Sequence, residues 1–518
     1  MKRRMVFMVA AGFGLAVSAL GAESYDVTIE HGAAVKMRDG VVLRADVYRP
    51  KGEGKFPVLL ERTPYDRRGG VDFGLRAAAR GYAVIFQDVR GRYASEGEWY
   101  TFKHESEDGY DTVEWAAALP YSNGKVGMFG GSYVGATQML TAIAAPPHLA
   151  GVFPVVTASN YHDGWTYQGG AFELWFNSSW TTGLAQDTLN RRVGREQNPV
   201  PQWVWKLPLT SYPVLNADME NLAPYYLDWL AHPTYDDYWK RLSIEDQHAK
   251  IQVPAYHLGG WYDYVLKGIA SGVEREKPVK IFVMGENAWR EEDDWPLARA
   301  KSTRYYLHSS SSANSLLGDG MLDTEAPQTE TPDHFVYNPT EHVPTRGGGL
   351  CCDNDRLASG AFDQRPNEAR GDVLVFTTPA FHQDFEVTGP VSLELYASSS
   401  AVDTDFTGKL VDVWPNGFAQ NLTDGILRAR YRNSQEKPEF MNPGEVYKFT
   451  IDLWATSNVF KAGHKLRLEV SSSNFPRFDR NLNTGEPAGS STRLVKATNT
   501  IYHDRDHPSA LILPVIPR

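Results

Sequence analysis

The sequence has only two cysteines in 518 residues, and these are adjacent, Cys351 and Cys352. That scarcity excludes a scaffold stapled by several disulfides and a cysteine-based zinc cluster. Positive charge is also scarce, because 52 Lys and Arg stand against 63 Asp and Glu, a net charge of −11. We therefore expect no nucleic-acid partner. What is present is a hydrophobic fraction of 42% with 12% aromatics, enough to build large cores and to exclude a disordered chain.

Residues 1–22 have the layout of a secretory signal peptide. Three cations, Lys2, Arg3 and Arg4, precede an apolar run from residue 5 to residue 20, and small residues lead to a polar stretch that begins at Glu23. No later run approaches eighteen apolar residues, so we expect no membrane span. The predicted location is periplasmic or secreted, with the mature fold starting near Tyr25.

Residues 23–160 alternate between predicted strands and helices, which is typical of an α/β fold with a parallel sheet. Strands are predicted at 41–48, 56–61, 82–87 and 125–129, and helices at 74–80 and 111–119. Residues 161–248 are rich in Trp and have a helical pattern broken by prolines, which indicates a helical insertion that covers the sheet. The α/β pattern resumes over 249–276 with a strand at 253–258.

Residues 277–518 read almost entirely as short strands. Predicted strands lie at 374–377, 391–397, 447–453, 465–471 and 510–515, separated by turn signals. Short strands at such spacing indicate a β-sandwich or jelly roll.

The segment KVGMFGGSYVGATQ, residues 125–138, joins a strand to a helix of small residues through Gly130, Gly131 and Ser132. A serine on a sharp strand-to-helix turn needs small neighbours, because its backbone is strained and its hydroxyl must project above the sheet. The following helix N-terminus can stabilise an oxyanion. The usual motif has Gly two residues after the serine, whereas here Val134 stands there. A glycine-rich turn without chemistry is the alternative.

The serine segment GGSYVGATQ resembles that of the cocaine esterase-like and X-prolyl dipeptidyl-peptidase hydrolases. Similar motifs are RTPYDRR (62–68), DVRGRYASEGEWY (88–100), GGWYDYV (259–265), LVDVWPNG (410–417) and SSSNFPRFDRNLNTG (471–485). The resemblance implies an α/β-hydrolase domain with a helical lid insertion, followed by a C-terminal jelly roll of the galactose-binding-like type. Sugar binding does not follow from that fold.

The resemblance assigns four site residues. Ser132 would be the nucleophile and Asp263 the acid that orients a triad histidine. The hydroxyl of Tyr65 and the backbone N–H of Tyr133 would form the oxyanion hole. Asp263 follows a predicted strand, in the chain order Ser then Asp of α/β-hydrolases. The structural alternatives are a surface acid for Asp263 and a packing side chain for Tyr65.

The triad histidine is missing from its expected place. A serine hydrolase needs this base, and relatives carry it on a Gly-Pro-Trp-x-His type loop after the acid. Here no His occurs from Tyr264 to Leu307. The resemblance implies that several tens of residues that relatives carry between GGWYDYV and the following segment are absent. His308 matches an ordinary strand residue of the family, and His162 and His257 are interpreted as structural. A decayed paralogue, a mis-assembled gene product and a fold whose partner closes the gap are all open explanations.

Other polar features are interpreted as structural. Asp88 and Arg90 are expected to form an ion pair that braces a loop. His503, Asp504, Asp506 and His507 are read as a solvated polar turn, so we predict no metal and no cofactor. Cys351 and Cys352 could form a vicinal disulfide or stay as thiols.

Two functions follow from these observations. The first is a secreted serine hydrolase that cleaves an ester or amide through an acyl-enzyme on Ser132. Its partner would be a small ester or amide with an acyl or aminoacyl group, or a short X-Pro peptide. The second is a catalytically impaired homologue that acts as a binding protein because the triad histidine segment is absent.

Overall fold

The computed structural model describes residues 24–192, 204–210, 222–253, 261–351, 356–487 and 489–517. The predicted signal peptide, His257, Cys352 and most of the strand expected at 253–258 lie outside these residues. None of the described helices is long and apolar enough to cross a lipid bilayer.

The chain forms two compact units. The first comprises Met1–Trp99, His104–Thr157 and Ala249–Ser271, and the second comprises Tyr100–Lys103, Ala158–His248 and Gly272–Arg518. By its contacts, the helical segment after residue 158 therefore groups with the C-terminal β-rich part of the chain and not with the α/β part.

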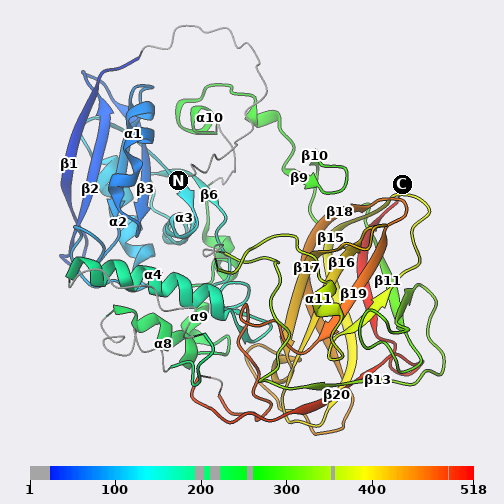
Figure 1. Ribbon diagram of the computed structural model, residues 1–518. Helices are drawn as coiled ribbons and strands as arrows, with labels where there is room; N and C mark the ends of the chain where they lie inside the picture. The colour runs from blue at the N-terminus through cyan, green and yellow to red at the C-terminus, as the bar shows by residue number, and fades with distance from the viewer. Residues whose placement is uncertain are drawn as a thin grey trace, which may run out of the picture. The chain divides into compact units, whose positions relative to one another are not determined.

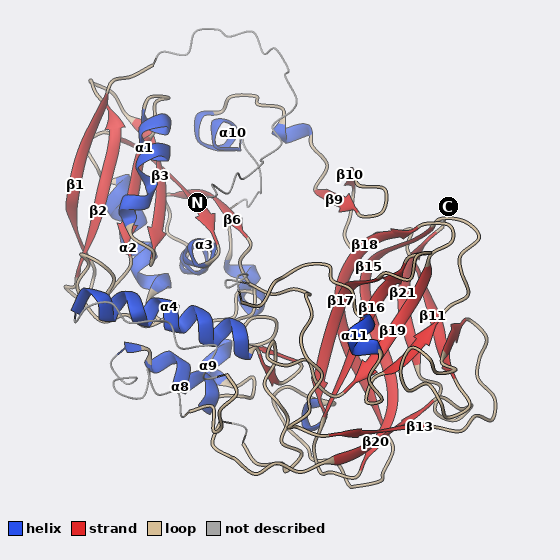
Figure 2. Ribbon diagram, in the orientation of Figure 1, coloured by secondary structure: helices blue, strands red, loops and turns tan. Residues whose placement is uncertain are grey.

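The first unit is built on a six-stranded sheet with the order β1-β2-β4-β3-β5-β6 (Figures 1 and 2). The strands are β1 (Val27–Lys36), β2 (Val42–Pro50), β3 (Phe56–Thr63), β4 (Ala83–Asp88), β5 (Ser122–Gly131) and β6 (Leu149–Val155). Strands β3 to β6 pair in parallel, whereas β1 and β2 are antiparallel, so the sheet is mixed and not purely parallel. Carboxyl ends of parallel strands meet at one edge, which is where such sheets bind ligands.

Helices cover both faces of this sheet. They are α1 (Val71–Ala78), α2 (Glu105–Ala117), α3 (Tyr133–Ala144) and α10 (Trp261–Lys267), with a 3₁₀ turn at Arg67–Gly70. One face packs Leu60, Val126 and Met128 against residues of α2 and α3. The opposite face packs Leu59 and Phe86 against α1 and α10. Successive residues of β3 thus point to opposite faces of the sheet, as in any strand, and both faces are buried under helices.

The second unit begins with a helical segment. Its elements are β7 (Tyr167–Gln168), β8 (Ala171–Phe172), α4 (Leu174–Arg192), α8 (Pro224–Ala231), α9 (Asp237–Lys240) and the 3₁₀ turn Glu245–Lys250. Tryptophans dominate its interior, where Trp229 and Trp239 are fully buried. The ring of Trp165 meets those of Trp180 and Trp229 edge to face, each at 5.4 Å between centroids. The tryptophan-rich sequence is therefore mainly core.

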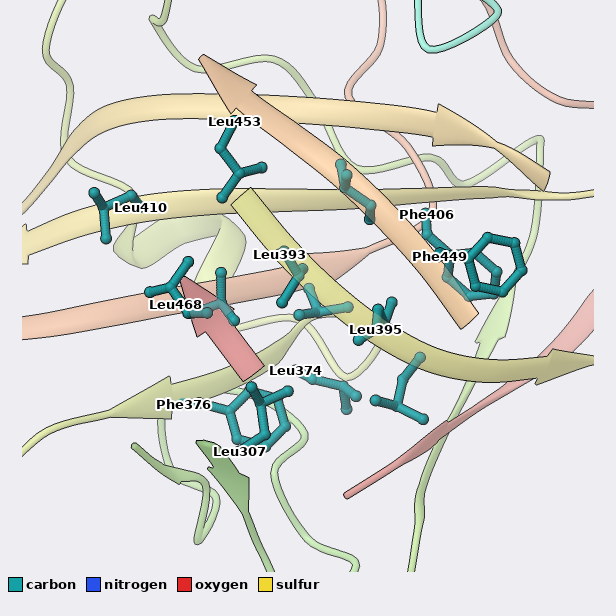
Figure 3. Packing of buried hydrophobic residues seen from close by; sticks show 14 of the residues in the cluster. Leu307, Leu374, Phe376, Leu393, Leu395, Phe406, Leu410, Phe449, Leu453 and Leu468 are labelled. Carbon is teal, nitrogen blue, oxygen red and sulfur yellow. The ribbon is translucent and has the colours of Figure 1, made fainter. Parts of the chain in front are cut away.

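The rest of the second unit is β-structure. Strands β9 (Val279–Val283) and β10 (Ala288–Glu292) form a hairpin, and an eleven-stranded sheet follows (Figure 2). Its strands are β11 (Lys301–His308), β12 (Met321–Asp323), β13 (Asp333–Tyr337), β14 (Leu374–Thr377), β15 (Phe385–Ser399), β16 (Asp405–Val413), β17 (Ala419–Arg428), β18 (Tyr447–Phe460), β19 (Lys465–Ser471), β20 (Ala497–Tyr502) and β21 (Ala510–Ile516). Short helical turns lie at Val273–Arg275, Arg365–Glu368 (α11) and Ala429–Tyr431. Figure 3 shows how leucines and phenylalanines from several of these strands fill one core.

The strands predicted at 374–377 and 465–471 have those bounds in the structure. Strands β1 and β6 were not predicted. In β1 every residue except Val35 is at least partly exposed, so its sequence lacks the pattern of a buried strand. Strand β6 is an apolar run, LAGVFPV, that contains Pro154, a residue that argues against a strand inside a sheet.

Candidate active site

Ser132 lies on a strained turn at the carboxyl end of β5. It precedes the first residue of α3 and has φ 59° and ψ −127°, a conformation that only glycine adopts without cost. Its N–H donates to the carbonyl of Val155 at 2.8 Å, and its own carbonyl accepts from the N–H groups of Gly135 and Ala136. The residue is exposed, and its side chain does not cap the helix. This is the geometry of a nucleophile elbow.

Tyr133, the next residue, is anchored below the turn. Its ring is buried, and its hydroxyl donates to Oε1 of Glu105 at 2.9 Å. Glu105 in turn accepts from Nη1 of Arg62 at 2.8 Å through Oε2, and both side chains are buried. Burial raises the pKa of Glu105, which the charge of Arg62 opposes. The backbone of Tyr133 is thus held in place at the start of α3, where an oxyanion would bind.

Tyr65 lies at the same edge, two residues after β3 ends. Its side chain is 41% exposed, and its N–H donates to Oγ1 of Thr63 at 3.1 Å. The loop is held by Arg92, which is buried and donates from Nε to the carbonyl of Pro64 at 2.9 Å. The guanidinium of Arg92 lies 5.5 Å from the ring of Trp99. The structure therefore brings Ser132, Tyr133 and Tyr65 to one edge.

The DVRGRYASEGEWY segment has a role that sequence reasoning did not identify. Arg92 from this segment holds the loop of Tyr65, and Trp99 packs on the ring of Tyr133 at 5.3 Å between centroids. Gly91 lets the segment fold back, because a Cβ there would lie 2.1 Å from the backbone N of Trp99. One loop thus braces both candidate oxyanion residues, which gives its sequence motif a physical reason.

Asp263 does not join this edge, contrary to what the sequence led us to expect. Its Oδ1 accepts from the hydroxyl of Tyr82 at 2.8 Å and lies 3.4 Å from Nζ of Lys267. Tyr82 directly precedes β4, so Asp263 lies at the amino end of the parallel strands, roughly 20 Å of strand away from the serine edge. The physical reason is the packing of α10. Its Leu266 is buried and its Tyr262 partly buried against one face of the sheet, and this orientation of the helix directs Asp263 toward Tyr82.

The structure brings no described histidine into hydrogen-bond contact with Ser132. In the first unit, Nδ1 of His31 pairs with Asp46 at 3.2 Å, and Nδ1 of His148 pairs with Glu114 at 2.8 Å. His104 occupies the N-cap position of α2, next to Glu105, without a capping hydrogen bond from its side chain, and it also has an interaction partner. None of these described histidines therefore takes the place of the triad base that the sequence lacks.

The expected ion pair between Asp88 and Arg90 is wrong, because both residues pair elsewhere. Asp88 accepts from the guanidinium of Arg67, and it also accepts from the N–H of that residue at 2.9 Å. Arg90 donates to Asp108 at 2.6 Å and to Asp39 at 2.7 Å. Burial raises the pKa of Asp88, which the bonds from Arg67 oppose.

In the second unit, Ser309, His503 and Glu330 have distances that resemble a triad. The Oγ of Ser309 lies 3.2 Å from Nε2 of His503, and Nδ1 of His503 lies 3.0 Å from Glu330. However, the hydroxyl donates to Asp333 at 2.6 Å, and Nε2 also pairs with Asp333 at 3.0 Å. Burial lowers the pKa of His503, but the bonds and charges of Asp333 and Glu330 outweigh it and raise that pKa. An imidazolium held between two carboxylates already carries its proton, so this buried cluster of His503, Asp333 and Glu330 is a structural ion-pair cluster and not a catalytic base.

The remaining histidine and cysteine predictions have mixed outcomes. His308 ends β11, and its Nδ1 pairs with Glu330 at 2.7 Å. His162 is buried, and burial lowers its pKa to about 4. His503 is buried in the ion-pair cluster with Asp333 and Glu330 and does not lie in a solvated turn. His507 pairs with Asp504 at 3.2 Å. Cys351 is disulfide-bonded.

Comparison with known proteins identifies the chain's relatives. The family model of the X-Pro dipeptidyl-peptidase (S15 family) matches residues 39–287, and that of the X-Pro dipeptidyl-peptidase C-terminal non-catalytic domain matches residues 271–512. Cocaine esterase from Rhodococcus sp. (strain MB1 Bresler) is 35% identical, with 93% of this chain and 98% of the relative covered.

Solved structures share the fold. An aminopeptidase from the marine sediment archaeon Thaumarchaeota archaeon superposes with a TM-score of 0.79 at 24% identity, covering 99% of this chain and all of its own. An α-amino acid ester hydrolase superposes with a TM-score of 0.76 at 23% identity, covering 97% and 98%. The fold is accordingly an α/β-hydrolase followed by a C-terminal β-rich domain.

The alignment with cocaine esterase also bears on the missing segment. It extends over 567 positions, more than the 518 residues of this chain, so the relative has residues that this chain lacks. The chain belongs to the cocaine esterase-like group of the X-Pro dipeptidyl-peptidase family of serine hydrolases.

Proposed function

We propose that this protein is a secreted serine hydrolase that cleaves an ester or amide through an acyl-enzyme on Ser132. The observation that carries the proposal is the exposed serine with φ 59° at the carboxyl end of β5, directly before α3. A backbone this strained is retained only where the surrounding structure enforces it, and such strain gathers at reactive sites. If the turn had no chemical role, a glycine at position 132 would make it without backbone strain, so the serine itself needs an explanation.

The same edge supplies the oxyanion stabilisers. The backbone N–H of Tyr133 and the hydroxyl of Tyr65 are the donors that we propose for the tetrahedral intermediate. Both residues are braced from below, by Glu105 and by Arg92 respectively. Preorganised donors of this kind contribute about 3 kcal/mol each to transition-state stabilisation. We leave Asp263 out of the mechanism because of its bond to Tyr82.

The substrate class follows from the relatives' names and remains broad. Cocaine esterase acts on an ester, and the solved neighbours include an amino-acid ester hydrolase and an aminopeptidase. We propose a small acyl or aminoacyl ester or amide, or a short X-Pro peptide. We further propose that residues 161–248 form a lid, that the β-rich domain is a jelly roll of the galactose-binding-like type, and that residues 1–22 are a signal peptide that directs secretion.

A second function is favoured by the absent histidine. If nothing replaces that base, the protein would bind ligands at the elbow without turning them over. The observation behind this alternative is that neither His31 nor His148 is available to Ser132.

Labelling with a fluorophosphonate separates the two functions, because the reagent reacts only with an activated serine. The mature chain is compared with Ser132→Ala, and hydrolysis of a short-chain aryl ester is recorded in parallel. We expect labelling that is lost in the variant. A folded wild-type protein that stays unlabelled and hydrolyses no ester would contradict the hydrolase and leave the binding protein.

A further inference from the structure

Glu61 is an acid on the central strand of the first unit's sheet, close to the elbow. It lies on β3, paired in register with Phe86 of β4, and its neighbour Leu60 pairs with Met128 of β5. Its Oε2 lies 3.5 Å from the position that a Cβ on Gly130 would take. Gly130 is two residues before Ser132, so the carboxylate reaches the base of the nucleophile turn.

The surroundings of Glu61 are apolar. On the neighbouring strands it lies between Phe86 and Phe129, whose rings are 6.0 Å apart, and Phe73 of α1 packs on Phe129 at 4.7 Å. Burial among these rings raises the pKa of Glu61 to about 7. A carboxylate that is half ionised near neutral pH has the proton affinity that a general base requires.

Within the described part of the chain, Glu61 has no hydrogen bond and no ion pair. The charged groups around it are committed elsewhere. On β3, Arg62 points to the opposite face and pairs with Glu105, and at the end of β4, Asp88 pairs with Arg67.

The helices on the Glu61 face offer it no partner either. On α1, Asp72 and Arg76 pair with each other in solvent. On α10, Lys267 pairs with Asp263, and Tyr262 donates to the carbonyl of Met128. Among the described residues, the Glu61 carboxylate therefore has no partner, and it lies near the turn that carries Ser132.

We propose that Glu61 is the proton acceptor that activates Ser132 in place of the histidine that this chain lacks. This inference rests on the proposed hydrolase function and names the residue that makes it possible. No hydrogen bond joins the two side chains directly, so the proposal includes one bridging water between the Glu61 carboxylate and Oγ of Ser132, an arrangement through which general bases can act.

The chemistry balances without any co-reactant. As Oγ of Ser132 attacks the carbonyl carbon, its proton passes through the water to the Glu61 carboxylate. The bond between the carbonyl carbon and the leaving oxygen or nitrogen then breaks, and the proton on Glu61 passes to the leaving group. In the second half-reaction, water gives its proton to Glu61, adds to the acyl carbon and releases Ser132, which regains that proton.

The test is the rate of fluorophosphonate labelling between pH 5 and 9 for wild type and Glu61→Gln. We expect the wild-type rate to rise in a step near pH 7. Glu61→Gln should remove the step and lower the rate at pH 8 by about 100-fold. Glu61→Asp keeps a carboxylate and should keep a step at a reduced rate, which a purely structural role would not predict. Circular dichroism confirms folding, and Glu53→Gln, on an exposed loop, is the matched control.

Each other outcome overturns the inference in a distinguishable way. Equal rates and steps in wild type and Glu61→Gln would reject Glu61 while leaving the hydrolase function intact. Loss of the step in His104→Ala, with Glu61→Gln unaffected, would make the histidine beside Glu105 the base. A wild-type protein that is never labelled would reject both the inference and the function on which it rests.

Discussion

The hydroxyl of Tyr133 donates a 2.9 Å hydrogen bond to the buried carboxylate of Glu105, which also pairs with Arg62. Through this pair of residues the turn that carries Ser132 is tied to the start of α2. The backbone on which an oxyanion would rest is thus supported by a charged network inside the sheet domain. Such networks cost much when one member is removed, because the remaining charge stays buried.

The first prediction concerns this network. Glu105→Gln should lower the free energy of unfolding by about 3 kcal/mol, since the buried Arg62 guanidinium loses its closest carboxylate and keeps only Asp108, at 3.9 Å. Tyr133→Phe should cost less, about 1–2 kcal/mol, because only one hydrogen bond is lost. Urea unfolding followed by circular dichroism measures both. Glu107→Gln, on the exposed side of the same helix, is the control and should change little. Equal stabilities for Glu105→Gln and the control would refute a supporting role for this network.

The second prediction concerns the strain at Ser132. Ser132→Gly should be more stable than Ser132→Ala by about 1–2 kcal/mol, because glycine adopts φ 59° without the steric cost that alanine retains. Both variants should lose fluorophosphonate labelling. The comparison removes the hydroxyl in each case, so the difference in thermal unfolding reports the backbone alone. If alanine proves as stable as glycine, the turn is not strained.

The third prediction concerns the pH dependence that Glu61 imposes on stability. Its pKa is raised by burial from 4.5 to about 7 in the folded state, so the folded protein binds the proton more tightly than the unfolded chain does. Stability should therefore fall as pH rises from 4.5 to 7 and stay low above that. Glu61→Gln removes this loss and should exceed wild type above pH 7 by up to about 3 kcal/mol. Thermal unfolding at pH 5 and pH 8 measures it. A variant with the wild-type pH dependence would contradict a raised pKa at this site.

The fourth prediction concerns His503, whose pKa is raised. A histidine with a raised folded-state pKa contributes stability that is complete below its unfolded value of 6.5 and is lost as pH rises through the folded value. The β-rich unit should thus weaken above neutral pH. His503→Gln should abolish this dependence and destabilise the protein at pH 6, since Asp333 and Glu330 lose their buried cation. The exposed His382→Gln is the control, and a calorimetric scan at several pH values decides the matter.

Much of the candidate site could be predicted from local sequence. The run from Lys125 to Gln138 places a serine between a strand and a helix of small residues, and the structure has Ser132 directly between β5 and α3. This works because the elbow is built from consecutive residues, whose φ and ψ are set by glycine positions and by the helix that follows. Tyr65 likewise follows its strand within two residues.

The partners of charged side chains could not be predicted in this way. Asp88 and Arg90 are two residues apart, yet Asp88 pairs with Arg67, and Arg90 pairs with Asp39 and Asp108. Side chains two positions apart at the end of a strand can be directed to different neighbours, and sequence spacing carries no information about which one is closer in space. Asp263 lies away from the Ser132 edge for a related reason. The packing of Tyr262 and Leu266 against the sheet stabilises α10 more than any position of one exposed carboxylate could, so it decides where Asp263 lies.

By itself, the sequence determined the family, the serine elbow and the absence of a histidine where a triad requires one, because these are features of residue identity along consecutive positions. Only the tertiary structure decided that Asp263 turns to Tyr82 and that Glu61, beside Gly130, has no partner among the residues that the structure describes. Both depend on which strands lie side by side and which face each side chain enters. Those are properties of packing between distant segments, which the order of residues does not reveal.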